Sequence, residues 1–150
     1  MSFITKLKSA FGNSNTSKTI ATQDTTEAIM KDIDNKPFAI SDQNVLYAGL
    51  NELGGYFFFQ TVIVGTLEVK TKKGAQLKIV GKRLNLALKS DSIEFETEST
   101  ALKGRMVTKI DFQIDESDAA KIDPLKIDEL TLSCKNHEIM FSTIVHDEEE

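Results

Sequence analysis

The chain has little of several residue types that carry chemistry, and each shortage narrows the range of functions. One of its 150 residues is cysteine, two are histidine and none is tryptophan. With Cys134 alone no internal disulfide can form, which fits a reducing, cytoplasmic location. Cys134, His137 and His146 are the only soft metal ligands, whereas a structural zinc site needs four ligands and a catalytic one normally needs three. We therefore expect no metal and no other cofactor.

Long hydrophobic runs are also missing. The longest nearly apolar run, residues 56–64, has about half of the roughly 20 residues that a membrane-spanning helix needs. Residues 1–8 lack the continuous apolar stretch and the cleavage site of a secretory signal, and Ser2 excludes myristoylation. These features predict a cytoplasmic protein, with attachment to the periphery of a membrane left open.

Motifs for catalysis and for nucleic-acid binding are absent as well. There is no Gly-x-Ser-x-Gly motif, and Gly74 and Gly81 are not placed between a strand and a helix as a phosphate loop requires. The many carboxylates of residues 111–123 fall on an outward strand face and a loop, where they are expected to be solvated and not to form a catalytic pair. Nucleic-acid binding is not expected, because the aromatic residues lie on apolar rows and the chain is acidic. We expect a protein that is not an enzyme.

The composition that remains is that of one globular domain. Hydrophobic residues make up 40% and charged residues 27%, which is typical of a folded chain. Residues 70–109 hold ten Lys/Arg and four Asp/Glu, whereas residues 111–150 hold three Lys/Arg and twelve Asp/Glu. Such asymmetry can mark a binding face, but basic and acidic strands that lie side by side explain it without a partner.

The pattern divides the chain into four parts. We expect residues 1–12 to form an amphipathic helix, residues 13–23 a polar linker, residues 24–146 a β-rich domain with its own short helices, and residues 147–150 an acidic tail. In the first helix the apolar residues fall within an arc of about 120°, and the two lysines lie on its flanks, as at a membrane surface. The residues expected to dock on a partner protein or a membrane are Phe3, Ile4, Lys6, Leu7, Lys8 and Phe11.

Two more helices are predicted before the sheet. Asp24 with Glu27 is a capping-box pattern that opens a short helix, which Pro37 ends. Ser41 is a suitable N-cap for a further helix that ends at Gly54-Gly55. Its apolar face is expected to comprise Val45, Leu46, Gly49, Leu50 and Leu53.

From Tyr56 onward the apolar residues alternate with a period of two, which predicts strands. The first strand is apolar on both faces, as a central strand is. Lys72-Lys73-Gly74 turns it into a return strand, which a bulge or bend interrupts at Gly81-Lys82. The six expected strands cover residues 56–69, 77–88, 93–98, 106–115, 130–134 and 139–143. We therefore predict a mainly β fold, with α+β as the alternative: a six-stranded antiparallel meander closed as a small barrel or sandwich, with two or three N-terminal helices.

The function expected from these features is binding. The first choice is a non-enzymatic module that engages a protein partner or a membrane surface through the first helix. Lysines of the predicted hairpin could add attraction to anionic lipid; they are Lys70, Lys72, Lys73, Lys78 and Lys82. The alternative is a carrier of an apolar, lipid-like ligand inside the sheet, lined by Phe57, Phe59, Ile63 and Phe95. A homo-oligomer is left open.

Overall fold

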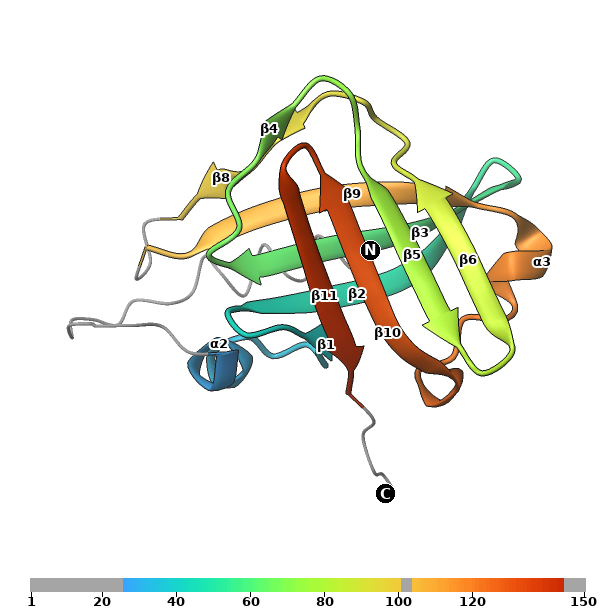
Figure 1. Cartoon of the computed structure of the whole chain (residues 1–150), viewed down its shortest axis with the longest axis horizontal. Coiled ribbons are helices and arrows are strands. Elements are labelled where there is room, and N and C mark those ends of the chain that lie inside the picture. Colours follow the sequence, from blue (N-terminus) through green and yellow to red (C-terminus); the bar gives the residue numbers. More distant parts are fainter. Residues whose placement is uncertain (1–25, 101–103, 145–150) are drawn as a thin grey trace.

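A computed structural model describes residues 26–100 and 104–144 of the chain. These residues form a mainly β, antiparallel fold, as the alternation predicts (Figure 1). The described elements are α2 (Thr26–Asp32), β1 (Ala39–Ile40), β2 (Asn44–Leu53), β3 (Tyr56–Gly65), β4 (Lys70–Thr71), β5 (Gln76–Gly81), β6 (Leu84–Lys89), β7 (Phe95–Glu96), β8 (Glu98–Ser99), β9 (Met106–Ile114), α3 (Glu116–Ala119), the 3₁₀ turn η1 (Pro124–Lys126), β10 (Ile127–Cys134) and β11 (His137–Thr143).

Nine of the strands form one sheet in the order β6-β5-β10-β11-β1-β2-β3-β9-β8, and β4 pairs with β7 as a separate ribbon. The sheet curls into a half-barrel, so that its two ends approach one another (Figure 1). They meet at one antiparallel bridge, between Ser90 just after β6 and Phe112 of β9. The predicted number of six strands is therefore too low.

The predicted helix that begins at Ser41 is wrong, because residues 44–53 form strand β2, which pairs with β3 along its whole length. The first four residues of β2 are all buried, so alternation is lost and the helical spacing of Val45, Leu46 and Leu50 is coincidental. Gly54 and Gly55 have φ of 61° and 88°. These positive values at both positions are those of a two-residue type I′ hairpin turn, not of a helix end.

The predicted meander, in which each strand pairs with the next one along the chain, is also wrong for part of the sheet. Strand β3 pairs with β2 and β9, whereas the expected return strand β5 pairs with β10 and β6. Lys72-Lys73-Gly74 therefore belongs to a crossover between distant parts of the sheet. At Gly81-Lys82 the chain makes a tight turn into β6, which agrees with the predicted bend, and the register irregularity beside it lies in β10, between Ile127 and Glu129.

Several sequence predictions are confirmed. Strand β9 spans most of the predicted 106–115, and β10 pairs with β11 around the Lys135-Asn136 turn. The helix predicted after Asp24 corresponds to α2. The predicted helix of residues 1–12, the linker 13–23 and the acidic tail lie outside the described residues.

The sheet has a buried core on its inner face and a smaller one on its outer face. The inner core gathers residues from both ends of the curled sheet, among them Phe59, Leu77, Phe112, Leu130 and Phe141. The outer core lies where α2 covers β2, β3 and β9; its buried members are Ile29, Ile33, Val45, Tyr47, Val62, Val64 and Val107. Strand β3 is thus apolar on both faces, as predicted for a central strand.

No helix among the described residues has the length and apolar character needed to cross a membrane.

Candidate functional site: a groove beside strand β11

Strand β11 has a neighbouring strand along most of one edge but along only a short part of the other. On one side β10 pairs with it from His137 to Ser142. On the other side β1 pairs only with Ser142 and Thr143, because β1 is two residues long. Within the described part of the chain, the segment Glu138–Met140 therefore has no neighbouring strand on the β1 side.

The chain leaves β11 after β1 because the turn of residues 41–44 is fixed elsewhere. Asn44 is 5% exposed, and its Oδ1 accepts hydrogen bonds from the backbone N–H groups of Thr66 (2.9 Å) and Leu67 (3.0 Å). The hydroxyl of Thr66 contacts Gln43 Oε1 at 3.1 Å. These bonds tie the turn to the segment that follows β3, so it cannot continue along β11.

The turn is closed tightly upon itself. The N–H of Ser41 donates to the carbonyl of Asn44 (2.9 Å), and the N–H of Asn44 donates to Ser41 Oγ (3.1 Å). A Cβ atom on Gly65, whose φ is 156°, would lie 2.2 Å from the carbonyl oxygen of Gln43. Only glycine therefore allows β3 to end so close to the turn.

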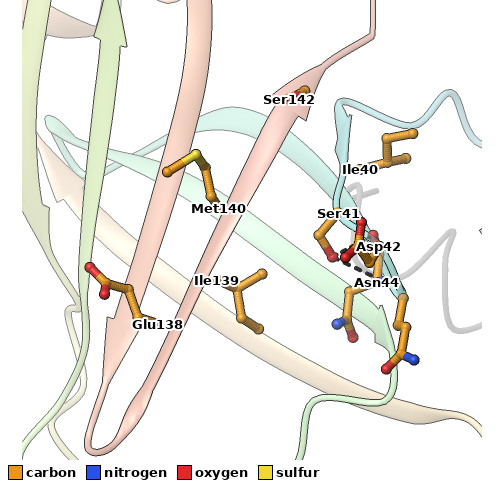
Figure 2. A pocket seen from close by; sticks show the side chains of 9 residues that line it. Ile40, Ser41, Asp42, Asn44, Glu138, Ile139, Met140 and Ser142 are labelled. Atoms are coloured by element: carbon orange, nitrogen blue, oxygen red, sulfur yellow. Dashed lines mark hydrogen bonds between the residues drawn. The ribbon is translucent and has the colours of Figure 1, made fainter.

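A groove of about 740 Å³ separates β11 from this turn (Figure 2). This volume lies within the range of about 300–1,000 Å³ typical of ligand sites. One wall comes from β11 and the other from the turn and the end of β1. The lining residues are Ile40, Ser41, Asp42, Gln43, Asn44, Glu138, Ile139, Met140 and Ser142.

The strand pairing determines which backbone groups face the groove. The N–H of Ile144 donates to the carbonyl of Phe38 (2.9 Å), so Ile144 directs its backbone polar groups toward β1. In an antiparallel ladder this direction alternates from residue to residue. The even-numbered residues of β11 therefore point the same way, and the N–H and C=O of Glu138 and Met140 face the groove.

The side chains around the groove combine apolar surface with negative charge. Met140 is 58% exposed, which is high for a large apolar residue in the middle of a strand. Ile139 is half-buried and packs against the inner core. The charged lining residues, Asp42 and Glu138, are both acidic and exposed. The groove can therefore accept an apolar side chain and a cation.

A second group of polar residues lies beneath α2 and has a structural role. Arg105 is 2% exposed, and its Nη2 donates to Asp32 Oδ2 of α2 at 2.9 Å. Burial raises the pKa of the Tyr47 hydroxyl well above its usual range, and the nearby Arg105 opposes this shift. Among the described residues, Tyr47 Oη has no hydrogen-bond partner. The arrangement attaches α2 to the sheet, and a phenol that remains protonated is a poor base.

Cys134 and His137, the cysteine and the histidine among the described residues, do not form a reactive or metal-binding pair. Cys134 is buried, its Sγ lies 3.7 Å from the carbonyl oxygen of Gly74, and burial raises the pKa of its thiol, which stays protonated at neutral pH. His137 is directly opposite Cys134 in the hairpin but is exposed. In residues 26–100 and 104–144, no three His, Cys, Asp or Glu residues are placed to hold a metal ion.

The three groups of site residues predicted from the sequence have different outcomes in the structure. All six docking residues of the first helix lie outside the described part. The five lysines are exposed but do not share a hairpin: Lys70 pairs with Glu96 in the β4–β7 ribbon, whereas Lys82 lies beyond the far end of β5. The predicted carrier lining does come together, because Phe59 and Ile63 belong to the inner core and Phe57 and Phe95 pack against it.

The groove itself was missed by the sequence predictions, because it depends on the pairing of residues 39–40 with residues 142–143, about a hundred positions apart. One local signal was available. Ser41 and Asn44 are residues that favour turns through side-chain hydrogen bonds. A turn at these residues is therefore an alternative to the helix N-cap predicted at Ser41. No protein-family model, curated protein or solved structure matches this chain.

Proposed function

We propose that this protein is a non-enzymatic binding module that takes an extended segment of a partner protein into the groove beside β11. The observation that carries the proposal is the stretch Glu138–Met140, which has no strand on its β1 side among the described residues. Unpaired strand edges are templates for an incoming strand, and many recognition domains bind peptides in this way. The backbone supplies affinity and the lining side chains supply selectivity.

The groove is suited to binding because its far wall is fixed before a partner arrives. The hydrogen bonds of Asn44 hold the turn of residues 41–44 at the end of β3. A site that is already in place loses little conformational entropy on binding. This supports a site for a single strand, with β11 on one side and the turn on the other.

A displayed random-peptide library, selected on the full chain, tests the proposal. Selected peptides should shift the NMR signals of Glu138 and Met140. Met140→Lys should weaken the binding of these peptides by about ten- to a hundred-fold, since burying the Met140 side chain is worth about 1.5–3 kcal/mol. Leu53→Lys is the matched control, because Leu53 is 67% exposed and lies at the opposite end of β2 from Asn44. Peptides that lose equal affinity with both variants, or shift other signals, would contradict the proposal.

Docking through the first helix remains a proposal of its own, supported by the amphipathic pattern of residues 2–11. Deleting residues 1–12 should leave the β fold intact and abolish binding to anionic liposomes. The same deletion should leave peptide binding at β11 unchanged. Liposome binding that survives the deletion would remove the membrane hypothesis.

The carrier hypothesis has less support. Phe59 and Ile63, two of its proposed lining residues, are each 1% exposed and pack with the other residues of the inner core. Side chains that fill the interior take the place of a ligand.

A further inference from the structure

The groove is specific enough to suggest what kind of segment it takes, and this inference rests on the proposed function. We infer that the bound segment is antiparallel to β11 and carries two apolar residues followed by a basic residue. The argument uses the direction of the strands, the facing of their side chains and the charge of the lining.

The direction follows from the neighbouring strand. Strand β1 runs antiparallel to β11, with Ala39 opposite Thr143 and Ile40 opposite Ser142. A segment that continues the line of β1 meets Met140 first, then Ile139 and then Glu138. All strand pairs described in this fold are antiparallel, so the segment completes the same pattern.

The side-chain facing fixes the character of each position. In a strand, side chains alternate between the two faces. Ile139 faces the inner core, whereas Met140 and Glu138 are exposed on the outer face. A residue opposite Met140 therefore points outward beside an apolar side chain, the next points inward toward Ile139, and the third points outward beside Glu138. Directly opposed side chains interact across a sheet, so the first two positions favour apolar residues.

The charge of the groove selects the third residue. Among the described residues, the charged ones that line it are Asp42 on the turn and Glu138 on β11, and none of these lining residues is Lys, Arg or His. A lysine or arginine opposite Glu138 would lie between two carboxylate-bearing walls. An acidic residue at the same position would be repelled by both.

A partner segment fits better than a second copy of this chain offering its own β11. In that copy, β11 is already flanked by β10 on one edge and by the turn of residues 41–44 on the other. A sheet is wider than a single strand and would collide with the fixed turn. The groove therefore has room for one free, extended strand.

Titration of the full chain with two synthetic peptides tests this inference. The first has the central residues Leu-Val-Lys between threonines, and the second has Leu-Val-Glu in the same frame. We expect the lysine peptide to bind about two- to five-fold more tightly, the ratio expected for one solvent-exposed ion pair. Glu138→Lys should reverse the preference, since the directly opposed residue is then basic, and Glu138→Gln should reduce it, since Asp42 remains. Glu52→Lys, an exposed position at the far end of β2, should leave it unchanged.

The possible failures are distinct. If both peptides shift the signals of Glu138 and Met140 with equal affinity, the inferred charge preference is wrong and the proposed function stands. If neither peptide binds the full chain, and peptides selected from the library shift signals away from β11, the proposed function is wrong as well. If the peptides bind only after residues 1–12 are deleted, the chain's own N-terminal segment competes for the groove, and a partner segment is not its resident occupant.

Discussion

Asn44 joins two turns that are 22 residues apart. One carboxamide oxygen accepts from two consecutive backbone N–H groups, and both bonds bring the end of β3 to the start of β2. The residue is nearly fully buried, so no water can replace it at low cost. A single side chain therefore determines where the far wall of the groove stands.

Asn44→Ala should lower the free energy of unfolding by about 2–3 kcal/mol, because it leaves the N–H of Leu67 buried without an acceptor and removes a second bond to Thr66. Urea unfolding measures the difference. Asn51→Ala, on the same strand but half-buried, should stay within about 0.5 kcal/mol of the wild type. Equal losses in the two variants would contradict the role given to Asn44.

The raised pKa of Asp111 should make the stability of the fold depend on pH. Burial raises the pKa of its carboxyl group, Asp91 adds to the shift, and the amide of Gln60 partly offsets it. A raised pKa in the folded state means that the folded chain holds the proton more tightly than the unfolded chain. The resulting stabilisation is fully present below the ordinary aspartate pKa of about 3.9 and is lost as pH rises through the folded-state pKa.

Asp111→Asn should therefore raise the thermal midpoint at pH 7 and leave it nearly unchanged at pH 3, because an amide is neutral at both values. Asp128→Asn, at an exposed position of β10, serves as the control and should show a smaller gain. Thermal unfolding followed by circular dichroism at the two pH values measures both. A gain of equal size at pH 3 and pH 7 would assign the effect to something other than ionisation.

At the scale of elements, α2 is a seven-residue helix that is too short to be stable alone. It is held by Ile29 and Ile33 in the outer core and by the hydrogen bond that Arg105 donates to Asp32. Because Arg105 is almost fully buried, its charge depends on its partners within the protein. The helix and the arginine therefore stabilise one another.

Asp32→Ala should lower the free energy of unfolding by about 1–3 kcal/mol, below the full cost of breaking a buried pair because the Asp32 side chain is 34% exposed. Adding Arg105→Met should recover part of the loss, since the buried charge is then gone. Asp34→Ala, an exposed neighbour just after α2, is the control. If Asp32→Ala behaves like the control in urea unfolding, the pair does not hold the helix.

The elements also show where sequence patterns succeed. Strand β9 from Thr108 onward and the β10–β11 hairpin were predictable because each buries one face there, with buried residues at every second position of β9 and β10. Strand β2 was not, because Val45 and Tyr47 pack under α2 while Leu46 packs in the inner core. A strand buried on both faces loses its alternation, and its apolar residues also match helical spacing.

At the scale of the whole molecule, the sheet order is the part that local patterns could not provide. The neighbours of β5 are β10 and β6, and the chain must cross from one end of the curled sheet to the other to reach it. The pairing of β1 with β11 joins the two ends of the described chain. The groove arises from this pairing, so the candidate site could not be predicted before the topology was known.

Hydrogen exchange of the β11 amides tests the open edge most directly. In the free protein, the N–H groups of Glu138 and Met140 should exchange rapidly, while those of Ile139 and Phe141, bonded to β10, should be slow. Adding the lysine peptide should slow Glu138 and Met140 and leave the other two unchanged. If all four amides are slow in the free protein, the edge is already paired and the account of the groove is wrong.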